Sequence, residues 1–142
     1  RSTSHSPSVR QSIVGVLAQR LIRVVCPNCG EAVEPTDEML KSADLTREIL
    51  ATQYKATNPV IRKPKGCSEC RFTGYRGRSA IHELMVISDP LRALILKRMD
   101  AGTIRKQAQI EGLKSLRDSA IEKLLGGQTS LEEIIRMTQL EN

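Results

Sequence analysis

The stretches VVCPNCG (Val24–Gly30) and KGCSECR (Lys65–Arg71) contain all four cysteines of the chain. Each stretch holds one C-x2-C pair, and 37 residues separate the two pairs. Two such turns can direct four thiolates at one ion, and four sulfurs arranged as a tetrahedron are a ligand set that a structural zinc ion takes. The sequence therefore favours a zinc site formed by Cys26, Cys29, Cys67 and Cys70.

The separation of the pairs predicts how such a site is used. It exceeds the ~15–20 residues of a common zinc ribbon, so the intervening segment is expected to fold and the ion to staple its two ends. Gly30, directly after the second cysteine, is expected to let the chain reverse so that backbone N–H groups face the sulfurs. Arg71 stands at the equivalent place after Cys70, which predicts a less ideal second turn.

Three other interpretations of the cysteines stay open at this point. The same ligands can hold an iron–sulfur cluster. A C-x2-C pair can be a thioredoxin-like redox pair, although the βαβ context of that motif is missing here. Four ordinary buried thiols are the third interpretation, but these would not be expected to fall into two C-x2-C pairs with none left over.

The composition suits a small protein of the cytosol. The 142 residues, 39% of them hydrophobic, allow one ordinary domain or two small ones, and the absence of Trp with only one Phe predicts an aliphatic core. No run of about 18 apolar residues is present, and residues 1–12 lack the apolar stretch of a signal peptide. We expect residues 1–12 to be a disordered leader or the ragged end of a cut chain.

The pattern of apolar and turn residues predicts a mainly α fold with a few short strands. Residues 13–25 are expected to end in a short strand, and another β-favouring stretch surrounds Ile81. Two short helices are expected between the cysteine pairs, and four amphipathic helices form a C-terminal helical subdomain over residues 88–142. The expected helix caps are Thr36 or Asp37, Asp44, Asp89, Thr103, Ser115 and Ser130.

The positive charge is concentrated in the cysteine-bearing half. Residues 1–80 carry 13 Lys and Arg against 7 Asp and Glu, which accounts for the whole net charge of +6, whereas residues 81–142 carry 9 of each. The simplest explanation is that basic residues offset the charge of a four-thiolate zinc centre, which is formally −2. The candidates for this role are Lys63, Lys65, Arg71, Arg76 and Arg78.

The alternative function is a nucleic-acid-binding protein with a zinc site and a helix-turn-helix. Residues 103–127 have the general pattern of that motif. The helix that would enter DNA carries Asp118 and Glu122 beside its two cations, so it offers no net positive face to phosphate, and we expect no nucleic acid partner. His5 and His82 are the only histidines and neither has a catalytic context, so no catalytic residue is predicted.

Three blocks of the sequence together resemble the C-terminal part of the type II secretion and type IV pilus assembly ATPases. The resemblance covers about residues 13–138, and the order and spacing of the blocks make it specific. The blocks are GVLAQRLIRVVCPNC, GCSECRFTGYRGRSAIHELMVIS and LRDSAIEKLLGGQTSLEEIIRMT.

The resemblance implies a cytoplasmic hexameric motor of RecA-like fold that lies peripheral to the inner membrane, where it docks on a platform protein. ATP and magnesium would bind only to the parent protein, because the family's phosphate-binding loop and its acidic and histidine boxes lie upstream of the matched stretch. Residues 13–25 would be the end of the ATPase core, 26–87 the zinc subdomain and 88–142 the helical subdomain. Arg20 would approach nucleotide or a subunit boundary, and the chain alone should be inactive.

Overall fold

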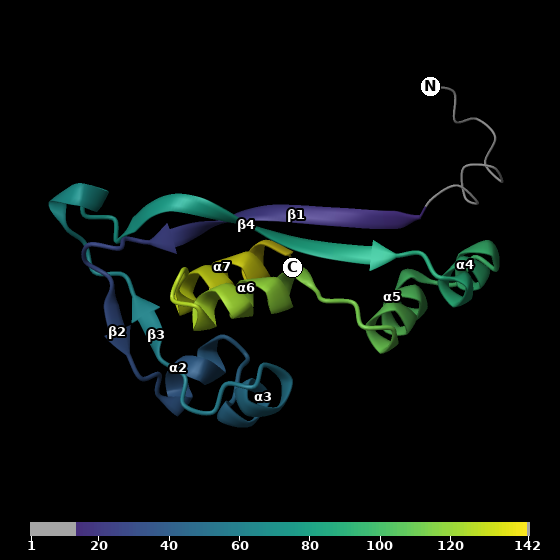
Figure 1. Cartoon of the computed structure of the whole chain (residues 1–142), viewed down its shortest axis with the longest axis horizontal. Helices are drawn as coiled ribbons and strands as arrows, with labels where there is room; N and C mark the ends of the chain where they lie inside the picture. The colour runs from purple at the N-terminus through teal and green to yellow at the C-terminus, as the bar shows by residue number, and fades with distance from the viewer. Residues whose placement is uncertain (1–13, 142) are drawn as a thin grey trace, which may run out of the picture. The chain divides into compact units, whose positions relative to one another are not determined.

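A computed structural model describes residues 14–141 of the chain (Figure 1). The predictions about residues 1–12, including His5, lie outside the described residues. None of the described helices is long and apolar enough to cross a membrane. The elements in chain order are β1 (Gly15–Val25), β2 (Glu31–Val33), α2 (Asp37–Ser42), α3 (Arg47–Gln53), β3 (Ile61–Lys63), the 3-10 helix η1 (Ser68–Cys70), β4 (Tyr75–Val86), α4 (Asp89–Leu96), α5 (Ala101–Ile110), α6 (Leu116–Leu125) and α7 (Leu131–Glu141).

The prediction of a mainly α fold with a few short strands is wrong. Strands β1 and β4 are 11 and 12 residues long, and the fold is a mixture of helices and two small antiparallel sheets. Only the end of β1 and the middle of β4, around Ile81, had the β-branched composition that predicts a strand. Pairing along their whole length satisfies the backbone hydrogen bonds of the remaining residues, and it overrides their weak local preference.

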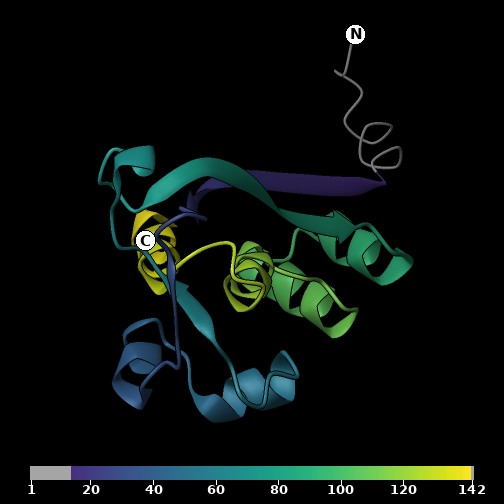
Figure 2. The same ribbon diagram turned by 60° about the vertical axis from the view of Figure 1, so that its left-hand side comes forward.

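The two sheets have two strands each. β1 pairs with β4, and the flanking bonds from Ile87 N–H to the Val14 carbonyl and from Cys26 N–H to the Gly74 carbonyl show that the strands are antiparallel. β2 pairs with β3 in a short antiparallel ladder in which Ala32 faces Arg62. Figures 1 and 2 show this ladder leading from the cysteine turns to α2 and α3.

The described chain divides into two compact units, residues 14–19 with 82–116 and residues 20–81 with 117–141. In the first unit, α4 begins after Ser88, whose hydroxyl accepts from Leu91 N–H, and α5 begins after Asp100, whose carboxylate accepts from Thr103 N–H. Each cap lies one to three residues before the one predicted, at Asp89 and Thr103. Ile87, Leu91 and Ala108 are the buried apolar residues of this unit.

The second unit contains the cysteines and the larger core. The Thr36 hydroxyl caps α2 as one of the predicted alternatives, whereas α3 is capped by Thr46 and not by Asp44. The helical pattern of the sequence predicts that Leu116 and Leu124 are both buried. Leu124 is fully buried, but Leu116, which belongs to the first unit, is only half-buried. The other leucine and isoleucine side chains that are fully buried in the second unit are Leu40, Leu45, Leu50, Ile61, Ile81, Ile121 and Ile134.

Candidate metal centre

The first cysteine pair lies in the turn that follows β1. Cys26 is fully buried, and its N–H donates to the Gly74 carbonyl at 2.9 Å, which ties this turn to the start of β4. Gly30 N–H donates to the Cys26 carbonyl, not to a sulfur. A Cβ at Gly30 would lie 2.5 Å from a methyl carbon of Val25, so any larger residue at this position would force its neighbours to shift.

The second pair supplies most of the backbone donors. Cys67 precedes η1, and its N–H donates to the Cys70 sulfur at 3.2 Å. Gly74 N–H donates to the same sulfur at 3.2 Å, and Gly66 N–H donates to the Cys29 sulfur at 3.2 Å. Such N–H donors stabilise thiolates and hold them in a fixed orientation. The expectation that a chain reversal at Gly30 turns backbone N–H groups toward the sulfurs is therefore wrong, because the backbone donors are Gly66, Cys67 and Gly74.

The four sulfurs converge from the two turns. All four lie within 4.8 Å of one another. The separations of Cys26 from Cys67, of Cys29 from Cys70 and of Cys67 from Cys70 are each 3.8 Å. Four sulfurs placed ~2.3 Å from a central zinc ion at tetrahedral angles lie ~3.8 Å apart. The donor set therefore fits one tetrahedral ion.

The pKa values show why these thiols favour a cation. Burial raises the pKa of Cys70, but hydrogen bonds from two backbone amides outweigh it and lower the pKa from 9.0 to about 6. The Asn28 amide lowers the pKa of Cys67. For Cys29 a hydrogen bond from Gly66 N–H lowers the pKa, yet burial and the neighbouring cysteines raise it to about 11. Close sulfurs cannot all be anionic by themselves, whereas a bound divalent ion stabilises all four thiolates.

The geometry separates the interpretations that the sequence left open. The four cysteines are free, and a separation of 3.8 Å is far from the ~2.05 Å of a disulfide bond. Sulfurs within 4.8 Å of one another leave space for one ion, whereas the irons and sulfides of a cluster would have to lie between them. A single tetrahedral ion is the species that this arrangement can hold.

Comparison with known proteins places the whole arrangement in one family. The family model described as type II/IV secretion system protein matches residues 3–136. The chain belongs to this family. Its relatives in this family are longer proteins. The chain spans only 14% to 24% of the length of three curated relatives that it matches.

Two relatives illustrate the range of the family. The chain is 38% identical over 131 residues, 92% of its length, to the type IV pilus assembly ATPase PilB of Thermus thermophilus, of which it covers 14%. It is 39% identical over 132 residues, again 92% of its length, to the type II secretion system ATPase E of Vibrio cholerae, of which it covers 24%. One of these relatives is therefore named as a pilus assembly protein and the other as a secretion protein.

The remaining residues singled out in the sequence lie away from the sulfurs. Arg20 is half-buried on β1. Together with Arg136 of α7 it lines a pocket of about 260 Å³. His82 is exposed on β4. Among the described residues, the hydrogen bonds to the four sulfurs come from backbone amides, from Asn28 and from the other cysteines. The basic residues that were expected to offset the thiolates make none of these bonds.

Two features of this unit were missed from the sequence. Asn28 is one of the two residues inside the first C-x2-C turn, and its amide donates to the Cys67 sulfur at 3.3 Å. The polar residue inside the turn was the available signal for this donor. Glu133 is fully buried and accepts hydrogen bonds from Arg23 and Arg136, so that α7 is tied to β1. No local sequence pattern predicts this pairing, because Arg23 and Glu133 are 110 residues apart.

Proposed function

We propose that this chain is the zinc-stapled structural and docking module of a hexameric ATPase that powers type II protein secretion or type IV pilus assembly. The observation that carries the proposal is the set of four sulfurs at tetrahedral spacing in a member of the secretion family. Cys26, Cys29, Cys67 and Cys70 would hold the zinc ion. When bound, the ion would cross-link the two turns and would not catalyse a reaction.

The activity and partners proposed for the parent protein follow from its relatives. Both relatives named above are described as ATPases. By analogy, the parent would bind ATP and magnesium, assemble as a homohexamer and dock on an inner-membrane platform protein from the cytoplasmic side. Arg20 would lie near nucleotide or a subunit boundary in that assembly.

The 142-residue chain itself should not hydrolyse ATP. Its sequence contains no G-x4-G-K-[ST] phosphate-binding loop. We expect no phosphate release above background from purified chain with ATP and magnesium. Turnover that persists through further purification, and follows the protein through each column, would contradict this part of the proposal.

The metal is tested by elemental analysis of the purified chain. We expect one zinc per chain in the native protein and its loss in Cys70→Ser, because this variant removes the sulfur with two backbone donors. Ser68→Ala, an exposed change inside η1, is the matched control and should keep the zinc. Iron in place of zinc, or no metal after anaerobic preparation, would overturn the assignment.

Hydrogen exchange tests how far the staple reaches. The domain boundaries expected from the sequence predict that zinc removal exposes amides in residues 26–87 and leaves the whole helical tail, 88–142, protected. The compact units instead group α6 and α7 with the cysteines and place α4 and α5 in the other unit. If α6 and α7 lose protection together with the cysteine turns while α4 and α5 do not, the tail is not an autonomous subdomain.

The nucleic-acid alternative loses its main support in the second unit. Arg117 of α6 donates to the Ala43 carbonyl, and Asp118 accepts from the Tyr54 hydroxyl at 2.6 Å. These contacts use part of the α6 surface to pack against the segment between the cysteine pairs. Binding to a random DNA duplex with a steep salt dependence would revive this alternative.

A further inference from the structure

The turn around η1 has an exposed tip on the second unit. We define the tip as Lys65, Glu69, Arg71, Phe72, Arg76 and Arg78. It lies at the end of the β1–β4 ribbon that carries the cysteine turns (Figure 1). Phe72, the only Phe of the chain, is 75% exposed there.

The backbone of the tip is strained. Arg71 and Phe72 are consecutive residues with φ of 56° and 61°, in the left-handed region that glycine and asparagine adopt at lower cost. Phe72 N–H donates to the Cys67 carbonyl at 2.8 Å, and the Thr73 hydroxyl donates to the Cys70 carbonyl at 2.7 Å, so the cysteine turn itself holds this conformation. Such strain is typical of residues kept for a function.

A phenylalanine at position 72 does not stabilise the fold. A phenylalanine that is exposed contributes little packing, and in the left-handed region it is less stable than glycine would be. A single exposed apolar side chain is common and needs no explanation. One that is held rigidly in a strained conformation, on a turn fixed by four cysteines, indicates a contact outside the chain.

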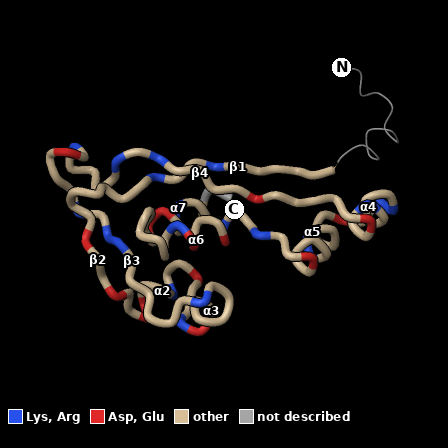
Figure 3. Tube along the Cα trace, viewed as in Figure 1, with Lys and Arg blue, Asp and Glu red and all other residues tan. Residues whose placement is uncertain are grey.

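The charge around Phe72 is strongly positive. Residues 62–78 contain six Lys and Arg and one acidic residue, Glu69, which gives +5, and a zinc centre with four thiolates would still leave +3. Arg76 and Arg78 lie on the face of β4 opposite to Tyr75, whose hydroxyl contacts Ser130 at the start of α7. Figure 3 shows the basic residues along this end of β4.

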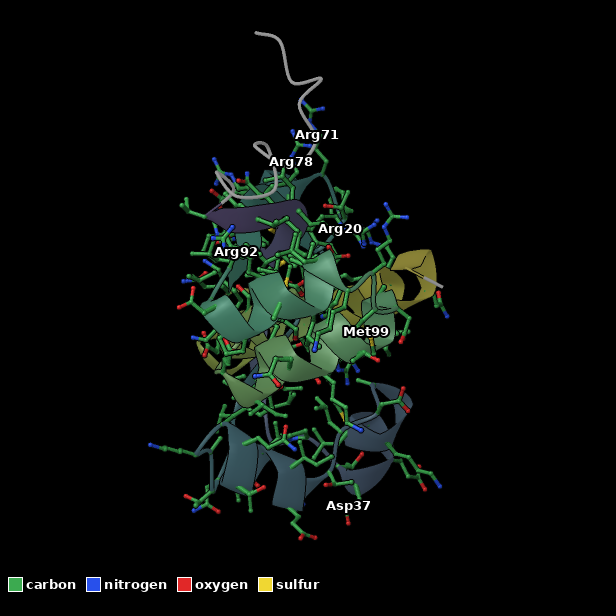
Figure 4. All side chains as sticks on the ribbon, turned by 90° about the vertical axis from the view of Figure 1, so that its right-hand side faces the viewer. Arg20, Asp37, Arg71, Arg78, Arg92 and Met99 are labelled. Carbon is green, nitrogen blue, oxygen red and sulfur yellow. The ribbon has the colours of Figure 1, made fainter. Side chains whose placement is uncertain are left out.

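Two basic side chains of the tip share a direction. In Figure 4, Arg71 and Arg78 project from the same side of the second unit, and Asp37 at the start of α2 lies on the opposite side. Residues 31–55 contain six Asp and Glu against three Lys and Arg, which gives −3. The segment that contains α2 and α3 is therefore net negative, whereas residues 62–78 around the tip are net positive.

We propose that this tip binds the surface of a membrane that contains anionic phospholipids, with Phe72 inserted among the headgroups. Aromatic rings favour the boundary between headgroups and acyl chains, and Lys and Arg around them are attracted to anionic lipid. The inference goes beyond the proposed motor role and needs neither ATP hydrolysis nor the identity of the metal.

The expected strength follows from the charge. Each basic side chain close to an anionic surface strengthens binding about fivefold at physiological salt. Arg76→Ala and Arg78→Ala together should therefore weaken binding of the 142-residue chain to phosphatidylglycerol vesicles about 25-fold. Lys41→Ala removes one exposed cation from α2, on the acidic side, and should change binding less than twofold, which makes it the matched control.

Insertion of the tip can be observed directly because the chain contains no Trp. Phe72→Trp introduces one indole at the tip, and Ile110→Trp introduces one on α5 at a position that is also 75% exposed. Vesicles of equal parts phosphatidylcholine and phosphatidylglycerol should shift the emission of the Phe72→Trp variant to shorter wavelength and leave that of the Ile110→Trp variant unchanged. Vesicles of phosphatidylcholine alone should shift neither.

Four results would overturn the proposal. These are equal binding to neutral and anionic vesicles, an equal spectral shift in both Trp variants, binding that survives the double arginine substitution, and tighter binding of the tip to a DNA duplex or an acidic polypeptide than to anionic vesicles. Circular dichroism of each variant establishes that it is folded. Zinc content is measured on the same samples, so failure of the lipid contact and failure of the zinc assignment give different results.

Discussion

The buried carboxylate of Glu133 offers the sharpest test of how the second unit is held together. It is 1% exposed and accepts five hydrogen bonds from two arginines, which come from the backbone N–H and guanidinium of Arg23 and from the guanidinium of Arg136. The Arg23 guanidinium also lies 4.1 Å from the centre of the Tyr75 ring. This cluster joins the end of the chain to β1 and β4. Glu133→Gln keeps the shape of the side chain and removes its charge.

The size of the effect follows from the pKa of Glu133. Burial raises this pKa, but the hydrogen bonds from Arg136 and Arg23 outweigh burial and lower it from 4.5 to about 2. A shift of this size corresponds to about 3 kcal/mol of stability. Removal of one partner from a buried ion pair costs about 3–5 kcal/mol. Arg23 and Arg136 are 44% and 46% exposed and can rehydrate, so we expect a loss near 3 kcal/mol.

The same shift fixes the pH dependence. Because the pKa of Glu133 is lowered on folding, its contribution is fully present above its unfolded value of 4.5 and disappears as the pH falls towards 2. The Gln variant lacks this contribution at every pH. The difference in unfolding free energy between the two proteins should therefore be constant from pH 7 to about pH 5 and shrink below that.

Urea unfolding followed by circular dichroism measures this difference at each pH. Glu132→Gln is the matched control, because Glu132 is exposed beside Glu133 on α7, and its substitution should change stability by less than ~0.5 kcal/mol. A loss below ~1 kcal/mol at pH 7 in Glu133→Gln, or a difference that does not shrink in acid, would refute the reasoning.

Other substitutions test the packing around this cluster and the cysteine turns. Leu124→Ala opens a cavity at a fully buried site and should cost ~2–5 kcal/mol in urea unfolding, whereas Leu116→Ala, at a half-buried site, should cost less. Gly30→Ala places a Cβ 2.5 Å from Val25 and should cost about 1–3 kcal/mol and lower the zinc content. Gly15→Ala, where the nearest atom is at 3.4 Å, should have little effect, and an equal loss in both variants would contradict the steric argument.

The cysteine site could be predicted from the sequence because its information is local. Two C-x2-C turns each fix two sulfurs, and the remaining requirement is that the chain between them returns to its start. The β2–β3 ladder performs that return, with Glu31 opposite Lys63. Helix starts were predicted within a few residues for the same reason. Ser88 and Asp100 act as caps in place of Asp89 and Thr103 because several residues that can cap lie side by side.

The long strands and the ion cluster could not be predicted, because each depends on distant residues. In β1, exposed Val16, Leu17 and Leu21 alternate only poorly with polar residues, so the strand lacks the pattern of a half-buried sheet. Its length comes from pairing with β4, about 60 residues further along the chain. The spacing of Ser130 and Glu133 predicts a capping box, and the Ser130 hydroxyl does accept from Glu133 N–H. The Glu133 side chain turns away from the helix start to the arginines.

The basic residues near the second cysteine pair matter both for the metal centre and for the proposed membrane contact. The sequence suggested that lysines and arginines near the second pair serve to neutralise thiolates. The structure instead gives the sulfurs neutral donors, which are the amides of Gly66, Cys67 and Gly74 and the side chain of Asn28. Neutral donors leave the formal charge of −2 of a four-thiolate zinc centre unchanged, so the basic residues can still offset that charge without contacting the sulfurs. Residues 62–78 still carry +3 after that offset, and an anionic surface in contact with the tip would account for this remaining charge.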